Sequence, residues 1–203
     1  MKIIPKKSLG QNFLCDENIL EKIVNLTNIK NETILEVGPG TGNLTNHILK
    51  YEPKKFFAIE KDKYLASNLK KKYKEKIKII NEDILKINEK ELTKDKVIVF
   101  GNLPYNISTE ILSKWIINLN QNFWFNCLVL MFQKEVADRI IETTNKKNYG
   151  RLTILTSWRM NVTKILDVSP NSFFPVPKVK STVLLLEPKN DFFNIKDPKN
   201  LEH

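Results

Sequence analysis

The motif Asn102-Leu103-Pro104-Tyr105 combines residue types that could hold the exocyclic amino group of an adenine. The side-chain oxygen of Asn102 and the backbone carbonyl of Pro104 could each accept one N–H of that group and hold its nitrogen in line with a methyl donor. Pro104 has no N–H of its own and keeps Leu103 extended. Tyr105 could stack on the base, which is worth about 1–3 kcal/mol. The motif therefore predicts a site that presents an amino nitrogen for methylation, with a simple turn as the alternative interpretation.

A glycine-rich turn carries Gly38, Gly40 and Gly42 soon after Glu36 and directly after a predicted strand. Glycines let the backbone turn tightly and approach a ligand closely. Glu36, in front of the first glycine, favours a cationic ligand group such as a sulfonium or an α-amine and disfavours a phosphate. The turn therefore predicts a binding site for a cationic group, and a purely structural turn between strand and helix is the alternative.

Acidic residues follow the next two predicted strands. Glu60 lies about 20 residues after the glycine-rich turn, where a carboxylate can accept hydrogen bonds from both ribose hydroxyls. Asp83 is placed to accept a hydrogen bond from an adenine amino group, and Ile84 is placed to pack on the ring. These residues predict a nucleoside pocket, although Glu60 could be a solvated loop carboxylate and Asp83 a turn residue.

Short apolar runs that alternate with amphipathic stretches are typical of an α/β protein with a doubly wound, parallel sheet. The carboxyl ends of parallel strands meet at one edge of such a sheet, so we expect the motifs above in a single cleft. A further helix, with Asp16 as its N-cap, should precede the first strand. The predicted strands are Thr33–Val37, Phe56–Ile59, Ile77–Ile80, Val97–Phe100, Leu128–Phe132 and Thr182–Leu186, and the predicted helices between them are Asn43–Tyr51, Lys61–Tyr73 and Ser108–Asn118.

The C-terminal part of the chain departs from this alternation. Ser169–Pro177 is rich in proline and phenylalanine and is predicted to be an ordered, irregular loop before the last strand. The chain after Glu187 is polar, and we expect little structure there. The composition of Arg151–Trp158 leaves strand and helix open.

The composition is that of an ordinary globular protein with a basic surface. The chain has 203 residues, a net charge of +10 and a pI near 9.4. A basic surface suits a polyanionic partner, because each phosphate contact releases counterions. The lysine-, isoleucine- and asparagine-rich composition of an AT-biased genome would give the same charge. The longest apolar runs, such as Cys127–Phe132, are too short to span a bilayer, and the N-terminal sequence does not favour a secretory signal.

The cysteines and histidines predict no metal site and no Ser/His/Asp group. Cys15 and Cys127 lack metal-ligand spacing, and we expect both inside structured elements as free thiols in a reducing cytosol. His47 cannot form a metal site alone and is expected on the surface of a helix. His203 ends a Leu-Glu-His sequence that looks like the remnant of an expression tag.

Five stretches resemble, in the same order, motifs of the KsgA/RsmA family of ribosomal RNA adenine dimethyltransferases. They are Ser8–Leu14, Glu36–Thr45, Gly101–Ser108, Phe132–Arg139 and Phe173–Ser181. The resemblance implies a Rossmann-like class I S-adenosylmethionine-dependent methyltransferase, with a seven-stranded, mostly parallel sheet, one antiparallel strand and helices on both faces. It also implies that Arg151–Trp158 is a helix. The implied reaction places two methyl groups on each of two adjacent adenines near the 3′ end of 16S rRNA, in the small ribosomal subunit.

The resemblance also implies residue roles. Gln11, Asn12 and Leu14 would lie against S-adenosylmethionine, and the turn from Gly38 through Gly40 and Gly42, with Glu36 before it, would hold its methionine part. Glu60 with Lys61 would bind the ribose, and Asp83 with Ile84 the adenine. Asn102 would lie beside both cofactor and target. The implied cofactor set contains no metal.

The target base would be removed from its stack and held between two aromatic side chains. Tyr105 would face one side of the base, and Phe173, which opens a Phe-x-Pro-x-Pro pattern, would stack on the other. Phe174 next to Phe173 leaves the choice between the two open, and a core phenylalanine is the alternative for Phe173.

We interpret residues 1–187 as the catalytic domain, and 188–203 as a polar tail that holds the start of a missing C-terminal domain and the tag remnant. We expect a cytoplasmic monomer without membrane contact. An Erm-type 23S rRNA adenine methyltransferase shares the motifs and is the nearest alternative. A non-catalytic RNA-binding assembly factor, a DNA adenine methyltransferase and a nicotinamide-dependent dehydrogenase are the others.

Overall fold

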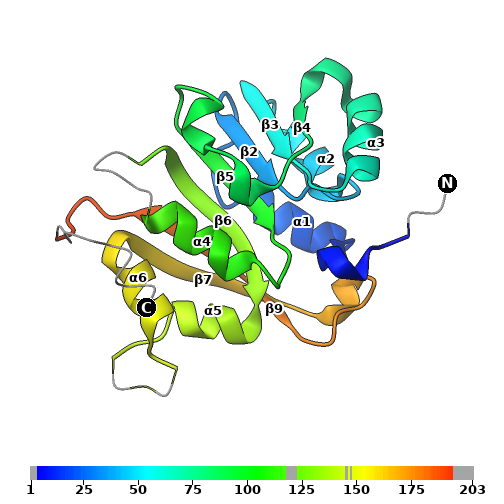
Figure 1. The fold of residues 1–203 in the computed structure, drawn as a ribbon. Coiled ribbons are helices and arrows are strands. Elements are labelled where there is room, and N and C mark those ends of the chain that lie inside the picture. The colour runs from blue at the N-terminus through cyan, green and yellow to red at the C-terminus, as the bar shows by residue number, and fades with distance from the viewer. Residues whose placement is uncertain (1–3, 118–122, 145, 147, 194–203) are drawn as a thin grey trace.

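The fold is built on one twisted sheet, seen in Figure 1 in a computed structural model that describes residues 4–117, 123–144, 146 and 148–193. Within these residues the sheet has seven strands in the order β4-β3-β2-β5-β6-β9-β7. β9 is antiparallel to both of its neighbours, whereas the other strands are mutually parallel. The strands are β2 (Thr33–Val37), β3 (Lys55–Ile59), β4 (Lys78–Ile80), β5 (Val97–Asn102), β6 (Phe125–Gln133), β7 (Met160–Val168) and β9 (Ser181–Pro188). The predicted sheet with one antiparallel strand is confirmed.

The six predicted strands are all present, with ends that differ by a few residues. β7 was not predicted. It lies at the edge of the sheet and pairs only with β9, so much of it stays in contact with solvent. Polar residues such as Lys164 and Asp167 therefore interrupt its sequence, and the strand lacks the apolar run by which the inner strands are recognised.

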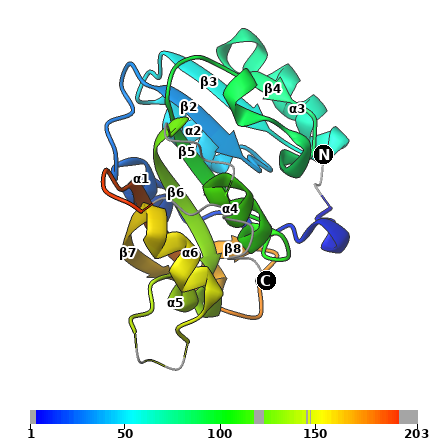
Figure 2. The same cartoon turned by 60° about the vertical axis from the view of Figure 1, so that its left-hand side comes forward.

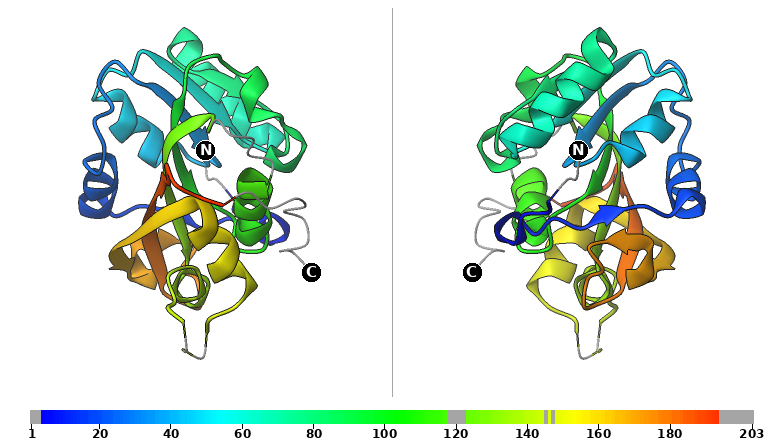
Figure 3. Two further views of the ribbon diagram at one scale, coloured as in Figure 1. Left: turned by 90° about the vertical axis from the view of Figure 1, so that its left-hand side faces the viewer. Right: turned by 90° about the vertical axis from the view of Figure 1, so that its right-hand side faces the viewer.

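Helices cover both faces of the sheet, as Figures 2 and 3 show. Side chains at successive positions of β2 point to opposite faces. Ile34 packs with α1 (Glu17–Val24) and α2 (Asn43–Leu49) on one face, and Leu35 packs with α4 (Ser108–Ile117) on the other. Because helices cover both faces, nearly every position of the inner strands is buried and apolar. One face carries α1 (Glu17–Val24), α2 (Asn43–Leu49) and α3 (Lys63–Tyr73), and the other carries α4 (Ser108–Ile117), α5 (Lys134–Ile140) and α6 (Arg151–Arg159).

Two helix predictions concern particular residues and are confirmed. The side chain of Asp16 caps α1, because its Oδ1 accepts hydrogen bonds from the backbone N–H groups of Asn18 at 3.1 Å and Ile19 at 3.2 Å. Its Oδ2 accepts a further bond from the Ser172 hydroxyl at 3.1 Å. The stretch from Arg151 is helical, as the resemblance implied.

A small second sheet corrects the prediction of an irregular loop at Ser169–Pro177. That segment contains a 3₁₀ turn, η5 (Pro170–Ser172), and a two-residue strand, β8 (Phe173–Phe174). β8 pairs in antiparallel fashion with β1 (Phe13–Leu14), which follows another 3₁₀ turn, η1 (Lys7–Leu9). The pairing holds the N-terminal segment beside the loop that precedes β9.

The structure also corrects two smaller predictions, the exposure of His47 and the location of Cys15 inside an element. His47 is buried rather than exposed: its Nδ1 lies 3.1 Å from the Asn43 carbonyl, and its Nε2 lies 3.0 Å from a carboxylate oxygen of Glu17. Cys15 lies between β1 and α1 and so outside any element, whereas Cys127 is buried in β6. Both thiols are free, and burial raises the pKa of Cys127 to about 12.

The chain beyond Glu187 is more ordered than predicted as far as the structure describes it. β9 continues to Pro188. Phe192 then packs edge-on against Trp158, with ring centroids 6.4 Å apart, and the Trp158 indole N–H donates to the Phe193 carbonyl at 2.7 Å. Residues 194–203, and with them most of the predicted tail, lie outside the described residues. No helix in the described ranges is long and apolar enough to cross a bilayer.

Candidate active site

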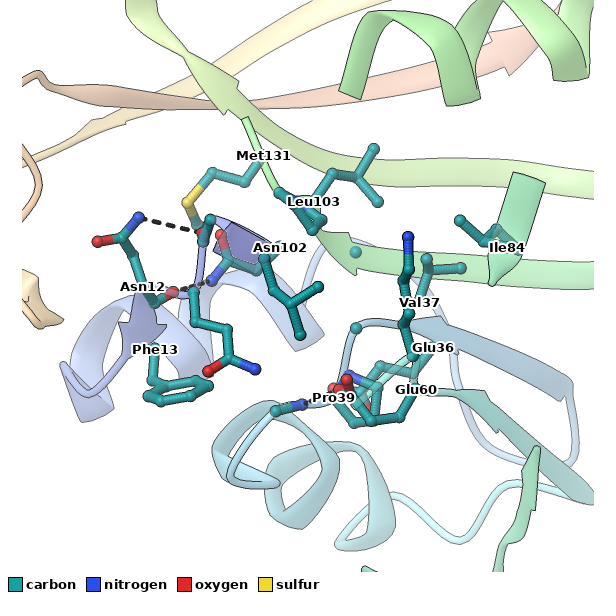
Figure 4. A pocket seen from close by; sticks show the side chains of 18 of the residues that line it. Asn12, Phe13, Glu36, Val37, Pro39, Glu60, Ile84, Asn102, Leu103 and Met131 are labelled. Carbon is teal, nitrogen blue, oxygen red and sulfur yellow. Dashed lines mark hydrogen bonds between the residues drawn. The ribbon is translucent and has the colours of Figure 1, made fainter. Parts of the chain in front are cut away.

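A cavity lies at the carboxyl edge of β2, β3, β4 and β5, beneath the N-terminal segment. About 1260 Å³ of space that no atom fills lies within its outline, open solvent at its mouth included. Figure 4 shows Asn102 beside Asn12 on one side of it, with Glu36 and Glu60 on the other. The structure brings nearly all predicted site residues to this cavity: Gln11, Asn12, Leu14, Glu36, Gly38, Gly40, Glu60, Lys61, Asp83, Ile84, Asn102, Leu103, Pro104 and Tyr105.

The glycine-rich turn has a backbone that only glycine adopts readily. Gly38, Gly40 and Gly42 have φ angles of 72°, 59° and 84°. A Cβ on Gly40 would lie 2.7 Å from a ring carbon of Phe13 in the N-terminal segment. Gly42, predicted as a cofactor contact, does not line the cavity. A Cβ there would lie 2.5 Å from the Tyr73 hydroxyl, so this glycine allows α2 and α3 to pack closely.

The carboxylate of Glu60 joins the glycine-rich turn to the end of β3. One oxygen accepts the backbone N–H of Gly40 at 3.0 Å and the other accepts that of Asp62 at 2.8 Å. Burial raises the pKa of Glu60, and these N–H donors oppose that rise. Each oxygen keeps a further lone pair, so the carboxylate can still accept hydrogen bonds from a ligand.

Glu36 is the most deeply buried carboxyl group of the site, at 2% exposed. The Thr45 hydroxyl donates to it at 2.6 Å. Burial raises the pKa of Glu36 to about 8, although the Thr45 bond lowers it, and the negative charge of Glu60 adds to the rise. A cation that entered the cavity would favour the ionised form of Glu36.

Asp83 and Lys61 form an ion pair at the rim, with 2.7 Å between the ammonium and a carboxylate oxygen. That hydrogen bond lowers the pKa of Asp83. The other oxygen of Asp83 accepts the backbone N–H of Leu85 at 3.1 Å. Lys61 is the only basic side chain among the described residues that line the cavity, and its charge is offset by Asp83.

The side chain of Asn102 has a defined orientation. Its amide nitrogen donates to the backbone carbonyl of Asn12 at 2.8 Å. A carbonyl can only accept, so the nitrogen must face Asn12 and the amide oxygen must face away from it. Within the described ranges, no hydrogen bond to that oxygen forms, and the oxygen remains available as an acceptor.

The two residues after Leu103 are each tied to a neighbouring element. The carbonyl of Pro104 accepts the N–H of Ile107 at 3.1 Å, which leaves its second lone pair. The Tyr105 hydroxyl lies 2.6 Å from the Ser181 hydroxyl at the start of β9, and burial raises the pKa of Tyr105. Ser181 was not predicted as a site residue, although it ends the Phe173–Ser181 motif.

A second residue that sequence reasoning missed, Asp62, holds the N-terminal segment. Its Oδ2 accepts the side-chain amide of Gln11 at 3.1 Å and lies 2.9 Å from the Lys6 ammonium, while its Oδ1 caps α3. Gln11 therefore lines the cavity while bound to Asp62. Next to it, the carbonyl of Leu14 accepts the Asn43 amide at 2.7 Å.

Phe173 is the predicted site residue that the structure places apart from the others. It is 3% exposed, packs in the core on the α1 face and does not line the cavity. The pairing of β8 with β1 sets it opposite Leu14 and turns it inward. Phe174 is 56% exposed. The expected location of Phe173 at the cavity is therefore wrong for this structure, and its role toward a base stays a prediction.

The sequence of this chain is similar to those of ribosomal RNA adenine methyltransferases. The family described as "Ribosomal RNA adenine dimethylase" matches residues 4–203. The chain is 62% identical, over 202 residues, to "Ribosomal RNA small subunit methyltransferase A" of Pelagibacter ubique (strain HTCC1062), with 100% of this chain and 77% of the relative covered. It is 44% identical to the protein of the same name from Wolbachia pipientis subsp. Culex pipiens (strain wPip), with 91% and 70% covered.

Comparison with solved structures supports the same fold. A dimethyladenosine transferase from Plasmodium falciparum superposes with a TM-score of 0.77 and 36% identity, over 87% of this chain and 63% of the other. The 23S rRNA methyltransferase ErmE superposes with a TM-score of 0.73 and 24% identity, over 94% and 74%. At that identity the second likeness shows the fold alone.

Proposed function

This chain belongs to the ribosomal RNA adenine dimethylase family, and from that premise we propose that it dimethylates N6 of two adjacent adenosines near the 3′ end of 16S rRNA. The methyl donor is S-adenosylmethionine and the substrate is the small ribosomal subunit. The observation that carries the proposal is the amide of Asn102, whose nitrogen is fixed by Asn12 so that its oxygen is left to accept an amino N–H.

The residues of the cavity fit the donor. Glu36, Glu60, Glu82 and Asp83 supply four carboxyl groups, and the single basic side chain among the described lining residues is already paired. Such a lining favours a cationic ligand and disfavours a phosphorylated one. Glu60 would bind the ribose, Asp83 and Ile84 the adenine, and the turn at Gly38 the methionine part.

The donor supplies a methyl group made electrophilic by its sulfonium. The protein contributes position. The exocyclic nitrogen of adenine is a poor nucleophile, because its lone pair is delocalised into the ring. The Asn102 oxygen and the Pro104 carbonyl would each accept an N–H of this nitrogen, and Tyr105 would hold the face of the base. Once methylated, the nitrogen is acidic enough for water to take its proton.

The second aromatic contact to the base would come from the loop before β9. Phe173 is the residue that the family motif implies, and Phe174 is the one exposed here. Separate alanine substitutions, with rRNA affinity measured for each, assign the contact. A loss confined to Phe174→Ala would remove Phe173 from the role.

The proposal is tested with small subunits that lack the modification, labelled donor, and mass spectrometry of the 16S rRNA. Two adjacent dimethylated adenosines are the expected product. Asn102→Ala should lower the rate about 100-fold, as misplacement of a reacting group does, and should change donor affinity far less. Asn161→Ala, on the exposed edge strand β7, is the matched control. Equal losses of donor affinity and rate in Asn102→Ala would contradict the assigned role.

The alternatives are separated in the same assay. An Erm-type enzyme would label 23S rRNA instead of small subunits. A non-catalytic assembly factor would bind small subunits without transferring a methyl group, and calorimetry would show whether it binds the donor. We further propose that the protein acts as a monomer in the cytoplasm, which light scattering and cell fractionation test.

A further inference from the structure

The wall of the cavity that carries Asp83 and Ile84 has no strand to hold it. Between β4 and β5 the chain forms two 3₁₀ turns, η3 (Ile84–Lys86) and η4 (Glu89–Glu91). Ile84 is nevertheless buried, at 5% exposed, and lines the cavity (Figure 4). The buried backbone groups of such an irregular segment need hydrogen-bond partners. Within the segment the Ile87 N–H donates to the Ile84 carbonyl at 3.3 Å, which leaves that carbonyl a second lone pair.

Lys114 of α4 supplies these contacts. Its ammonium donates to the Ile84 carbonyl at 2.8 Å, to the Ile87 carbonyl at 2.5 Å and to a carboxylate oxygen of Glu89 at 2.7 Å. An ammonium has three donors, so all of them are used on this one segment. The Lys114 side chain is 19% exposed and that of Glu89 is 7% exposed. The same Glu89 oxygen accepts the Trp115 indole N–H at 2.7 Å.

α4 is itself tied to the catalytic motif. The backbone N–H of Ile107, just before the helix, donates to the Pro104 carbonyl at 3.1 Å, and the Ser108 hydroxyl donates to the Tyr105 carbonyl at 3.3 Å. Lys114 therefore links α4, which holds Pro104 and Tyr105, to the wall of the cavity that carries Asp83 and Ile84. It does not line the cavity and cannot touch either ligand.

We propose that Lys114 is a positioning residue that sets the adenine-binding wall of the donor pocket and thereby its preference for adenine. This inference rests on the proposed function, because it takes the ligand of that wall to be the adenine of the donor. Lys114→Met keeps the length and apolar part of the side chain and removes its three donors, so Asp83 and Ile84 should lose their fixed position.

The probes are S-adenosylhomocysteine and its deaminated analogue S-inosylhomocysteine, bound to the whole chain and measured by calorimetry. The analogue places a carbonyl oxygen where adenine has an amino group, opposite the carboxylate of Asp83. The wild-type protein should prefer the adenine compound about 10- to 100-fold, because the analogue leaves the Asp83 acceptor without its donor. Lys114→Met should bind S-adenosylhomocysteine about tenfold more weakly and lose most of the preference.

The matched control is Lys164→Met in β7, which also removes an ion-paired lysine, here bonded to Asp167 at 2.9 Å. It should leave both affinities unchanged. Because Lys114→Met could fold poorly, Glu89→Gln is measured beside it. That variant keeps the oxygen that accepts from Lys114 and Trp115, and it should show a smaller change in the same direction.

Each outcome decides one question. A lower melting temperature in Lys114→Met with the wild-type preference intact would reduce Lys114 to a stability role and overturn the inference. A wild-type protein that does not bind S-adenosylhomocysteine would overturn the proposed function first. If the wild type binds both compounds equally, Asp83 does not recognise the adenine amino group, and the affinity for S-adenosylhomocysteine becomes the test. In that case, an unchanged affinity of Lys114→Met for S-adenosylhomocysteine would refute the positioning role of Lys114.

Discussion

The buried carboxyl group of Glu36 should make the stability of the protein depend on pH. In the folded protein burial raises its pKa to about 8, from an ordinary value of 4.5. Between these values the folded state keeps a proton that the unfolded chain has lost, so stability falls as pH rises. Each pH unit in that window corresponds to about 1.4 kcal/mol. Between pH 5.5 and pH 7.5, the titration of Glu36 should therefore lower the free energy of unfolding by about 2.5 kcal/mol.

Glu36→Gln removes this titration and nearly preserves the shape of the side chain. Urea unfolding followed by circular dichroism at pH 5.5 and 7.5 gives the free energy of unfolding of each variant. The wild-type protein should lose about 2.5 kcal/mol more than Glu36→Gln over this range, seen as an extra fall of about 1 M in the urea midpoint. Glu75→Gln, at an exposed glutamate, should behave as the wild type.

The comparison of variants isolates Glu36 from the other groups that titrate. Burial also raises the pKa of Glu60. Glu60 therefore also lowers the free energy of unfolding as pH rises, but it does so in both the wild type and Glu36→Gln. If wild type and Glu36→Gln lose equal stability between the two pH values, Glu36 does not hold a proton at neutral pH, and the assignment of its pKa to burial is refuted.

Three substitutions test other contacts. Ser181→Ala removes the partner 2.6 Å from the Tyr105 hydroxyl. It should lower the rate of methyl transfer about fivefold, because one hydrogen bond contributes about 1 kcal/mol. Adding Tyr105→Phe to this variant should lower the rate no further, and additive losses would contradict the coupling. Asp16→Ala removes the cap of α1 and should lower the free energy of unfolding by about 1–2 kcal/mol in urea, and an unchanged midpoint would argue against the cap. Gly40→Ala forces a Cβ to within 2.7 Å of the Phe13 ring at a φ of 59°, so the melting temperature should fall, with a cost of about 2 kcal/mol, and donor binding should weaken. Wild-type affinity in that variant would show that the turn can shift freely.

The inner strands could be predicted from the sequence because helices cover them on both faces. Ile34 and Leu35 are both fully buried, on opposite sides of the sheet, so the strand is a continuous apolar run. Motifs that directly follow such runs then fall at one edge of the sheet. For this reason the sequence alone is enough to assign Glu60, Asp83 and Asn102 to a single cleft.

The remaining features depend on contacts between distant parts of the chain. Nothing in the local pattern links Asn102 to the carbonyl of Asn12 or Tyr105 to Ser181. The sequence predicts a surface position for His47, whereas its burial comes from the packing of α2 near Glu17. The motif of Phe173 assigns that residue to the cavity, and only the pairing of β8 with β1 shows its inward direction.

The orientation of the Asn102 amide has a consequence for how the protein can be produced and handled. The carbonyl that fixes it comes from Asn12, in a segment outside the seven-stranded sheet. A chain started at residue 15 would keep every strand of that sheet, yet the amide could rotate and offer nitrogen or oxygen to an incoming base. A correctly folded sheet, judged by circular dichroism, would then give no indication that activity had been lost. Shortened versions of the protein should therefore keep the segment around Asn12.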